Sequence, residues 1–93
     1  MIRTIADRET QKIYDGIVST KLPIDIQNVA RRKLKMISAA VVISDLKVPP
    51  GNRLEKLAGS LEGYYSIRIN DQFRIVFRFE RCDAYDVKIT DYH

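Results

Sequence analysis

The stretch QFRIVFRFE, residues 72–80, alternates apolar and polar side chains over its whole length. A period of two is typical of a β-strand with one buried face, because successive side chains point to opposite sides of the sheet. The stretches YYSIRI (64–69) and AYDVKIT (84–90) alternate in the same way. Their short separations predict an antiparallel meander with one apolar face and one polar face. The residues expected on the apolar face are Tyr65, Ile67, Ile69, Phe73, Ile75, Phe77, Phe79, Tyr85, Val87 and Ile89.

Upstream of this meander the apolar residues are spaced as in amphipathic helices. Asp7 is a suitable N-cap for a first helix. The buried stripe expected on that helix is Ile13, Tyr14, Ile17 and Val18. Asp25 opens a second helix, whose apolar residues Ile26, Val29, Ala30, Leu34, Ile37 and Val41 line one side. The first half of the chain holds the basic excess, notably in the run RRKLK (31–35), of which Arg31, Arg32 and Lys35 lie mostly on another side.

Residues 1–6 and 53–58 are candidates for further short strands. Helices that precede a sheet in the chain are typical of the α+β class. We therefore expect N-terminal helices packed on one face of a small antiparallel β-sheet, in a single domain of residues 1–93.

The composition narrows the possible functions. The chain is 45% apolar and 30% charged, which is typical of a globular protein, and no apolar run is long enough to span a membrane. The first residues do not read as a signal peptide, so we expect a cytoplasmic protein. A single cysteine and a single histidine predict no disulfide, no metal site and no cofactor. The net charge of +4 favours an acidic partner.

The register of the first hairpin follows from matching the apolar faces of its strands. A three-residue loop at 70–72 places Ile69 opposite Phe73, and consequently Arg68 opposite Arg74 on the polar face. Like charges directly opposite each other destabilise a sheet, and paired guanidinium groups suit a bound phosphate. The alternative is two solvated arginines that turn away from each other.

The same matching applies to the second hairpin, with a loop at 81–83. The expected pairs are Phe79 with Tyr85, Arg78 with Asp86, and Arg74 with Thr90. If the last strand continues with the same alternation, Tyr92 falls on the polar face beside Arg74.

Two arginines beside a tyrosine suit attack on an RNA phosphodiester. RNA supplies its own nucleophile, the 2′-hydroxyl, so an enzyme needs a base, an acid for the leaving oxygen, and cations on the phosphate. Nearby cations favour a phenolate, which makes Tyr92 a candidate base. His93 can act as acid or base near neutral pH. Surfaces rich in arginine and tyrosine also bind proteins, so the spacing alone leaves both interpretations open.

The stretch PPGNRLEKLAGSLEGYYSIRINDQFRIVF (49–77) and the terminal DYH (91–93) resemble the HigB toxins of toxin–antitoxin systems, within the RelE/ParE superfamily. The resemblance implies the fold expected above. It also implies a metal-independent endoribonuclease that cuts mRNA in the A site of the ribosomal 30S subunit and inhibits translation. The implied partner is a HigA-like helix-turn-helix antitoxin.

The resemblance also assigns roles to particular residues. Tyr92 matches the catalytic tyrosine of the family, and Asp91 and His93 match the acid and imidazole on either side of it. Arg74 matches an arginine assigned to the phosphate, and Arg68 stands where relatives often have a basic residue.

Lys56, Arg53 and Arg78 are expected to bind the substrate. Many relatives have a lysine where this chain has Ala58, which predicts a weaker nuclease. Two alternatives remain at this point. ParE-like relatives of the same fold poison DNA gyrase, although the terminal DYH and the facing arginines argue against that function. An attenuated toxin that only binds its antitoxin would also accommodate Ala58.

Overall fold

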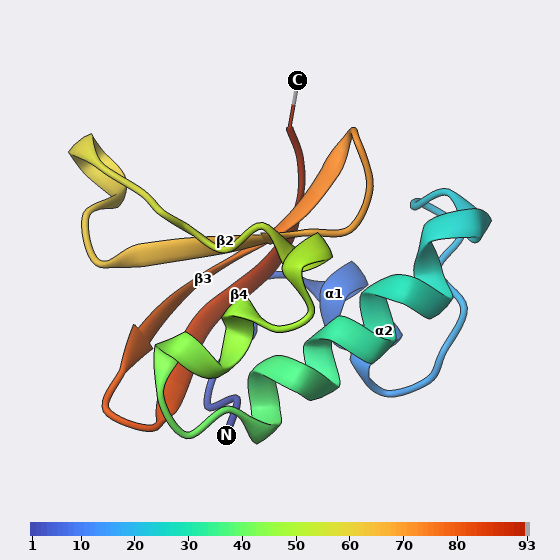
Figure 1. Cartoon of the computed structure of the whole chain (residues 1–93). Coiled ribbons are helices and arrows are strands. Elements are labelled where there is room, and N and C mark those ends of the chain that lie inside the picture. The colour runs from blue at the N-terminus through green and yellow to red at the C-terminus, as the bar shows by residue number, and fades with distance from the viewer. Residues whose placement is uncertain (93) are drawn as a thin grey trace.

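The computed structural model describes residues 1–92, and over that range two α-helices pack on one face of a four-stranded antiparallel sheet (Figure 1). This arrangement confirms the predicted α+β class. The strand order in the sheet follows the chain, β1-β2-β3-β4. The helices and strands are α1 (Arg8–Tyr14), α2 (Ile24–Ala39), β1 (Glu55–Lys56), β2 (Tyr64–Arg68), β3 (Phe73–Glu80) and β4 (Asp83–Asp91). The 3₁₀ turns are η1 (Ile43–Lys47), η2 (Pro50–Asn52) and η3 (Gly59–Leu61).

Helix α1 begins as expected but ends earlier. The Asp7 side chain accepts a hydrogen bond from the backbone N–H of Thr10 at 3.3 Å, which makes Asp7 the N-cap. Gly16 has φ +83°, a left-handed conformation that stops the helix and suits glycine. Ile17 and Val18, expected on the buried stripe, are therefore outside the helix, and 55% and 63% of their surface is exposed.

Helix α2 covers the centre of the sheet. Its fully buried apolar residues are Ile26, Ala30, Leu34 and Ile37. The helix starts after Pro23, with Asp25 in its first turn, where the negative charge of an acidic side chain interacts favourably with the helix dipole. Val41, expected on the buried side, lies beyond the end of the helix and is exposed.

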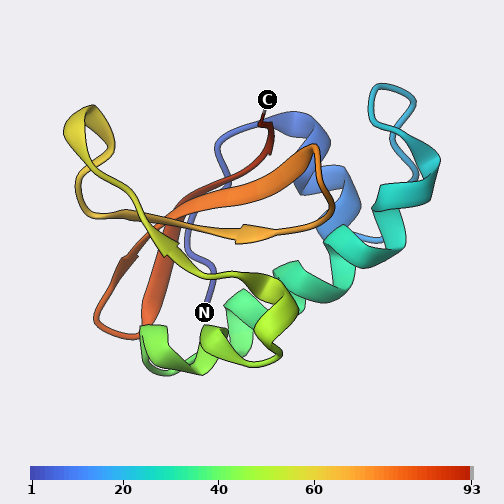
Figure 2. The same cartoon turned by 45° about the horizontal axis from the view of Figure 1, so that its top comes forward.

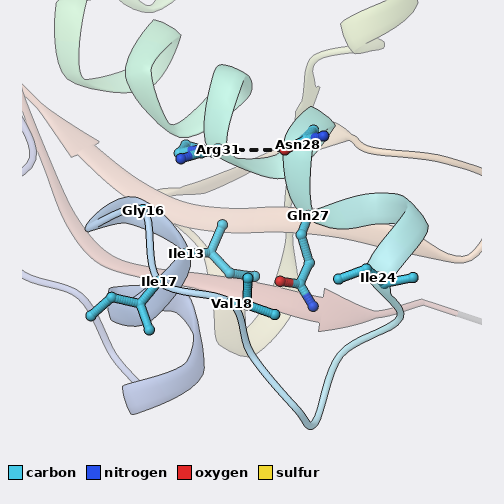
Figure 3. A pocket seen from close by; sticks show the side chains of 8 residues that line it. All are labelled: Ile13, Gly16, Ile17, Val18, Ile24, Gln27, Asn28 and Arg31. Carbon is cyan, nitrogen blue, oxygen red and sulfur yellow. Dashed lines mark hydrogen bonds between the residues drawn. The ribbon is translucent and has the colours of Figure 1, made fainter.

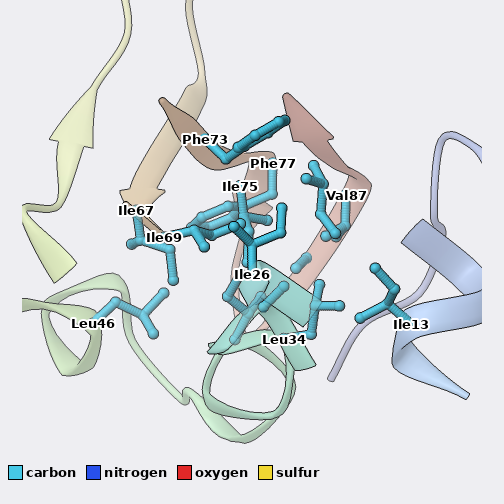
Figure 4. Close-up of a cluster of buried hydrophobic side chains, with 14 of the residues drawn as sticks. Ile13, Ile26, Leu34, Leu46, Ile67, Ile69, Phe73, Ile75, Phe77 and Val87 are labelled. Carbon is cyan, nitrogen blue, oxygen red and sulfur yellow. The ribbon is translucent and has the colours of Figure 1, made fainter. Parts of the chain in front are cut away.

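The first hairpin has the predicted register. Strand β2 pairs with β3 so that Ile67 is opposite Ile75 and Arg68 is opposite Arg74, and the backbone N–H of Ile69 donates to the carbonyl of Phe73 at 2.9 Å. The apolar side of this pairing forms the core together with α2 (Figure 4). Phe73 and Phe77 are buried as expected, whereas Phe79 is only partly buried.

The register predicted for the second hairpin is partly wrong. Arg74 is opposite Thr90 as predicted, but Arg78 is opposite Tyr85, not Asp86, and Phe79 is opposite Ala84, not Tyr85. The predicted ion pair is still formed, because Arg78 Nε lies 3.8 Å from Asp86 Oδ2. The register shifts between Val76 and Arg78, and Asp86 in the facing part of β4 has φ +55°. Such a β-bulge adds one residue to a strand and so reverses which side chains face the core beyond it. As a result Ala84 is buried, and Tyr85 is not.

The expected outer strands are short. Ile2 and Ile5 form isolated parallel bridges with Ala84 and Val87, so the first residues run beside β4 without forming a full strand. The expected strand at 53–58 is reduced to the two residues of β1. The two views agree that α2 lies on one side of the sheet, while the segment around η3 lies on the other (Figures 1 and 2). Among residues 1–92, none of the helices has the length and apolar character needed to cross a bilayer.

Candidate active site

Arg74 is the most firmly held cation on the polar face of the sheet. Only 12% of its side chain is exposed. Its Nε donates to Ser66 Oγ at 2.8 Å, and its Nη2 donates to the carbonyl of Arg53 at 2.6 Å and to that of Ser66 at 3.3 Å. The Glu55 carboxylate lies 3.7 Å from Nη2. These contacts fix the plane of the guanidinium group, so a bound anion would meet a preorganised donor.

Arg68 is the cross-strand neighbour of Arg74, and its side chain forms an ion pair with Asp71 in the adjoining turn. The predicted pair of arginines is therefore present, and each guanidinium has its own partner. Lys33 of α2 is 6% exposed and donates from Nζ to the carbonyl of Arg68. Burial lowers the pKa of Lys33, and the nearby cations Arg32, Arg68 and Arg74 lower it further. The end of β2 is thus a concentration of positive charge.

Tyr92 lies beside Arg74, as the strand alternation predicts. Its ring centroid is 5.8 Å from the guanidinium carbon of Arg74, within the range of a cation–π contact. Its backbone N–H donates to the carbonyl of Gln72 at 2.6 Å, so this part of the chain is anchored. At 41% exposure, the ring is accessible to a substrate.

The two neighbours of Tyr92 in the sequence, Asp91 and His93, were also expected in the site. Asp91 is opposite the buried Phe73 in the sheet register, so it lies on the other face from Arg74, and its carboxylate accepts a hydrogen bond from Gln72 Nε2 at 3.1 Å. His93, the predicted acid or base, lies outside the described residues.

The three expected substrate-binding residues have different surroundings. Arg78 forms an ion pair with Glu80, and its guanidinium carbon lies 4.5 Å from the ring centroid of Tyr85. Arg53 contributes its backbone carbonyl to Arg74. Lys56 is opposite Tyr65, on the apolar side of the sheet, and so does not share the face of Arg74.

Two contributors to the site were not found from the sequence. Ser66 is fully buried and holds Arg74, and Glu55 is its partner across β1 and β2. The place of Glu55 depends on the pairing of β1 with β2, and a two-residue strand is too short to show an alternation. The available signal was the position of Ser66, which falls on the same face as Arg68 and Arg74 in the first hairpin.

A cleft of about 300 Å³ opens beside Tyr92 on the polar face of the sheet. A second hollow, of about 100 Å³, lies between the end of α1 and the start of α2 (Figure 3). Ile17, Val18 and Ile24 line the second hollow and are mostly exposed, and Arg31 stands at the same hollow. The two hollows share no lining residue: strands β2, β3 and β4 supply most of the cleft, whereas the two helices and the segment after α1 line the second hollow.

Comparison with known proteins agrees with this architecture. A family model described as "RelE-like toxin of type II toxin-antitoxin system HigB" matches residues 4–93. Toxin HigB-1 of Vibrio cholerae serotype O1 is 48% identical over 74 residues, which are 78% of this chain and 78% of that protein. Endoribonuclease HigB of Proteus vulgaris is 29% identical over 100% of both chains.

The solved structures give the same fold. A chain of the heterotetrameric YoeB–YefM toxin–antitoxin complex from Staphylococcus aureus superposes with a TM-score of 0.63, at 24% identity, over 100% of this chain and 95% of that chain. At that identity the likeness shows the fold alone. The match of the family model over nearly the whole sequence carries the assignment: the chain belongs to the HigB-like toxins, a family of RelE-like toxins from type II toxin–antitoxin systems.

Proposed function

We propose that this toxin is an endoribonuclease that cuts mRNA in the A site of the ribosomal 30S subunit and thereby inhibits translation in the cytoplasm. The observation that carries the proposal is the anchored guanidinium of Arg74, 12% exposed, with the Tyr92 ring 5.8 Å away on an open surface. The printed name of the Proteus vulgaris relative, Endoribonuclease HigB, supports the same activity.

The proposed reaction needs no nucleophile from the protein. Tyr92 is the proposed general base that takes the proton of the 2′-hydroxyl, whose oxygen attacks the adjacent phosphorus atom while the bond from phosphorus to the 5′-oxygen breaks. Arg74 and Arg68 neutralise the charge that develops on the non-bridging oxygens. The leaving oxygen takes a proton from a general acid, for which we propose His93. The products are a 2′,3′-cyclic phosphate and a 5′-hydroxyl.

The proposed protein partner is a helix-turn-helix antitoxin of the HigA kind. Arg32 and Lys35 of α2 are exposed, and the half-buried Arg31 lines the hollow together with Ile17 and Ile24. A hollow of mixed apolar and polar lining beside basic residues suits an acidic, partly apolar segment. The structural neighbours are themselves toxins in complex with antitoxins, which supports a partner of this class.

Mapping of transcript ends after pulsed expression tests the proposed activity. Wild-type toxin is expected to produce cuts in phase with codons, and Tyr92→Phe is expected to produce none. Tyr14→Phe is the matched control, because it removes the same hydroxyl from a tyrosine that bonds Ser38 between the helices, at 3.1 Å. Cuts should persist in this control.

Other outcomes would favour the alternatives. DNA-damage signalling without RNA cuts would indicate gyrase poisoning, and growth without either effect would indicate an attenuated toxin. Incubation of purified toxin with RNA alone and with RNA bound to ribosomes tests the dependence on the ribosome separately.

A further inference from the structure

The cleft on the polar face extends the site beyond the phosphate. It begins at Tyr92 and follows β4 toward the bulge at Asp86. Val76 and Lys88, opposite each other at its centre, are one pair step, about 7 Å, from the pair of Arg74 with Thr90. A volume of about 300 Å³ is at the small end of the range for ligand sites. The residues that matter to its chemistry are Leu61, Tyr64, Val76, Asp86, Lys88 and Tyr92.

The lining combines an apolar body with one fixed polar end. Leu61 and Val76 supply apolar surface, and the rings of Tyr64 and Tyr92 are the kind of side chain on which unstacked bases pack. At the far end, the Tyr64 hydroxyl donates to Asp86 Oδ2 at 2.9 Å. That hydrogen bond raises the pKa of Tyr64 above its ordinary value, so this hydroxyl keeps its proton. Asp86 is thereby oriented as a hydrogen-bond acceptor in the cleft.

We propose that this cleft binds one unstacked nucleobase, next to the phosphate at Arg74, and that Asp86 accepts a hydrogen bond from an amino group on the edge of the base. The position of the phosphate rests on the proposed function; the base site itself does not. Adenine, cytosine and guanine carry such an amino group. Uracil presents carbonyl oxygens in its place, which a carboxylate repels. A well-formed contact of this kind discriminates by roughly 10-fold to 100-fold.

Cytidine and uridine monophosphates are the sharpest pair of probes, because their bases differ mainly in the group at one ring position. In NMR titrations, we expect cytidine monophosphate to shift the methyl resonances of Leu61 and Val76 saturably, with at least about tenfold higher affinity than uridine monophosphate. Ribose 5-phosphate and inorganic phosphate should leave these methyl groups unaffected. Equal binding of the two nucleotides, or equal shifts with ribose 5-phosphate, would overturn the proposal.

A substitution at the carboxylate tests its role. Asp86→Asn should bring the affinity ratio of the two nucleotides close to one, because an amide offers a donor as well as an acceptor. Asparagine tolerates the left-handed conformation at this position, so the bulge is retained. Asp83→Asn, in the same strand but outside the cleft, should leave the ratio unchanged. A ratio that is unaffected by Asp86→Asn would overturn the assignment of that residue.

The base site and the nuclease activity can fail independently. If cytidine monophosphate binds in the cleft of a protein that cuts no RNA, the base site stands and the proposed activity fails. If RNA is cut, but Asp86→Asn alters neither nucleotide binding nor the bases found at the cut sites, the activity stands and the base site fails.

Discussion

Replacing Ser66 with alanine removes one of the hydrogen bonds that hold Arg74. The Oγ of Ser66 accepts from Arg74 Nε at 2.8 Å, and the serine is fully buried. A hydrogen bond to a charged group contributes about 1.5–3 kcal/mol net. We therefore expect Ser66→Ala to lower the free energy of unfolding by about 1–3 kcal/mol, which is less than the total of about 5–15 kcal/mol typical of a domain.

The effect on the rate should exceed the effect on folding. The bonds from Arg74 Nη2 to the carbonyls of Arg53 and Ser66 survive the substitution, so the guanidinium is expected to tilt and remain in the site. A misplacement of about 1 Å can cost about 100-fold in rate. We expect RNA cleavage to slow by about 10-fold to 100-fold while the protein remains folded.

Single-turnover cleavage of ribosome-bound mRNA measures this effect, with urea unfolding of each variant to correct for the folded fraction. Ser38→Ala is the matched control, since it also removes a serine hydroxyl that bonds another side chain, the hydroxyl of Tyr14 at 3.1 Å. Ser38→Ala should cut RNA at the wild-type rate. The reasoning is refuted if Ser66→Ala cuts as fast as wild type, or if Ser38→Ala loses as much activity.

Three further predictions concern charge. Ala58→Lys should speed single-turnover cleavage by about tenfold. Ala58→Gln, whose side chain has a similar reach but no charge, should not. If Ala58→Lys cleaves no faster than wild type, a charge at this position does not act on the phosphate. Reversal of Arg31 and Lys35 to glutamate should weaken antitoxin binding at least about tenfold by calorimetry. Lys47→Glu, on η1, is the control for this charge reversal. If the double variant binds antitoxin with unaltered affinity, the basic residues of α2 face solvent and do not contact the antitoxin. Because the pKa of Lys33 is lowered by burial, the unfolded chain binds more protons between that lowered value and about 10.5, and stability rises with pH over that window. From about pH 7 to about pH 9.5, the unfolding free energy of wild type, measured with urea, should therefore rise relative to that of Lys33→Met. The opposite trend would contradict burial as the cause of the lowered pKa of Lys33.

The first hairpin could be predicted in detail because its apolar residues permit one register. The second could not, because AYDVKIT offers two candidates for the buried position. Tyr85 is the larger apolar side chain, but the bulge at Asp86 buries Ala84 in its place. An aspartate tolerates a left-handed backbone, yet that tolerance does not specify a bulge.

The site shows a similar division. Arg68, Arg74 and Tyr92 follow from strand alternation, which is a local property of the chain. The burial of Lys33 was not predicted, although it lies four residues before the buried Ile37 and three after Ala30, on the same side of α2. That spacing was available from the sequence. The contacts of Ser66 with Arg74 were not, because they depend on which rotamer the arginine adopts.

Strand β4 is held by the first residues of the chain. The backbone N–H of Asp86 donates to Thr4 Oγ1 across 82 residues of sequence, and that of Ile89 donates to Thr10 Oγ1 across 79. Contacts between such distant positions form slowly, because the chain between them must lose conformational entropy before the contacts can stabilise the fold. The same strand carries Thr90 and leads to Tyr92. In refolding from denaturant, β4 and the phenol at its end should therefore reach their final, anchored position late.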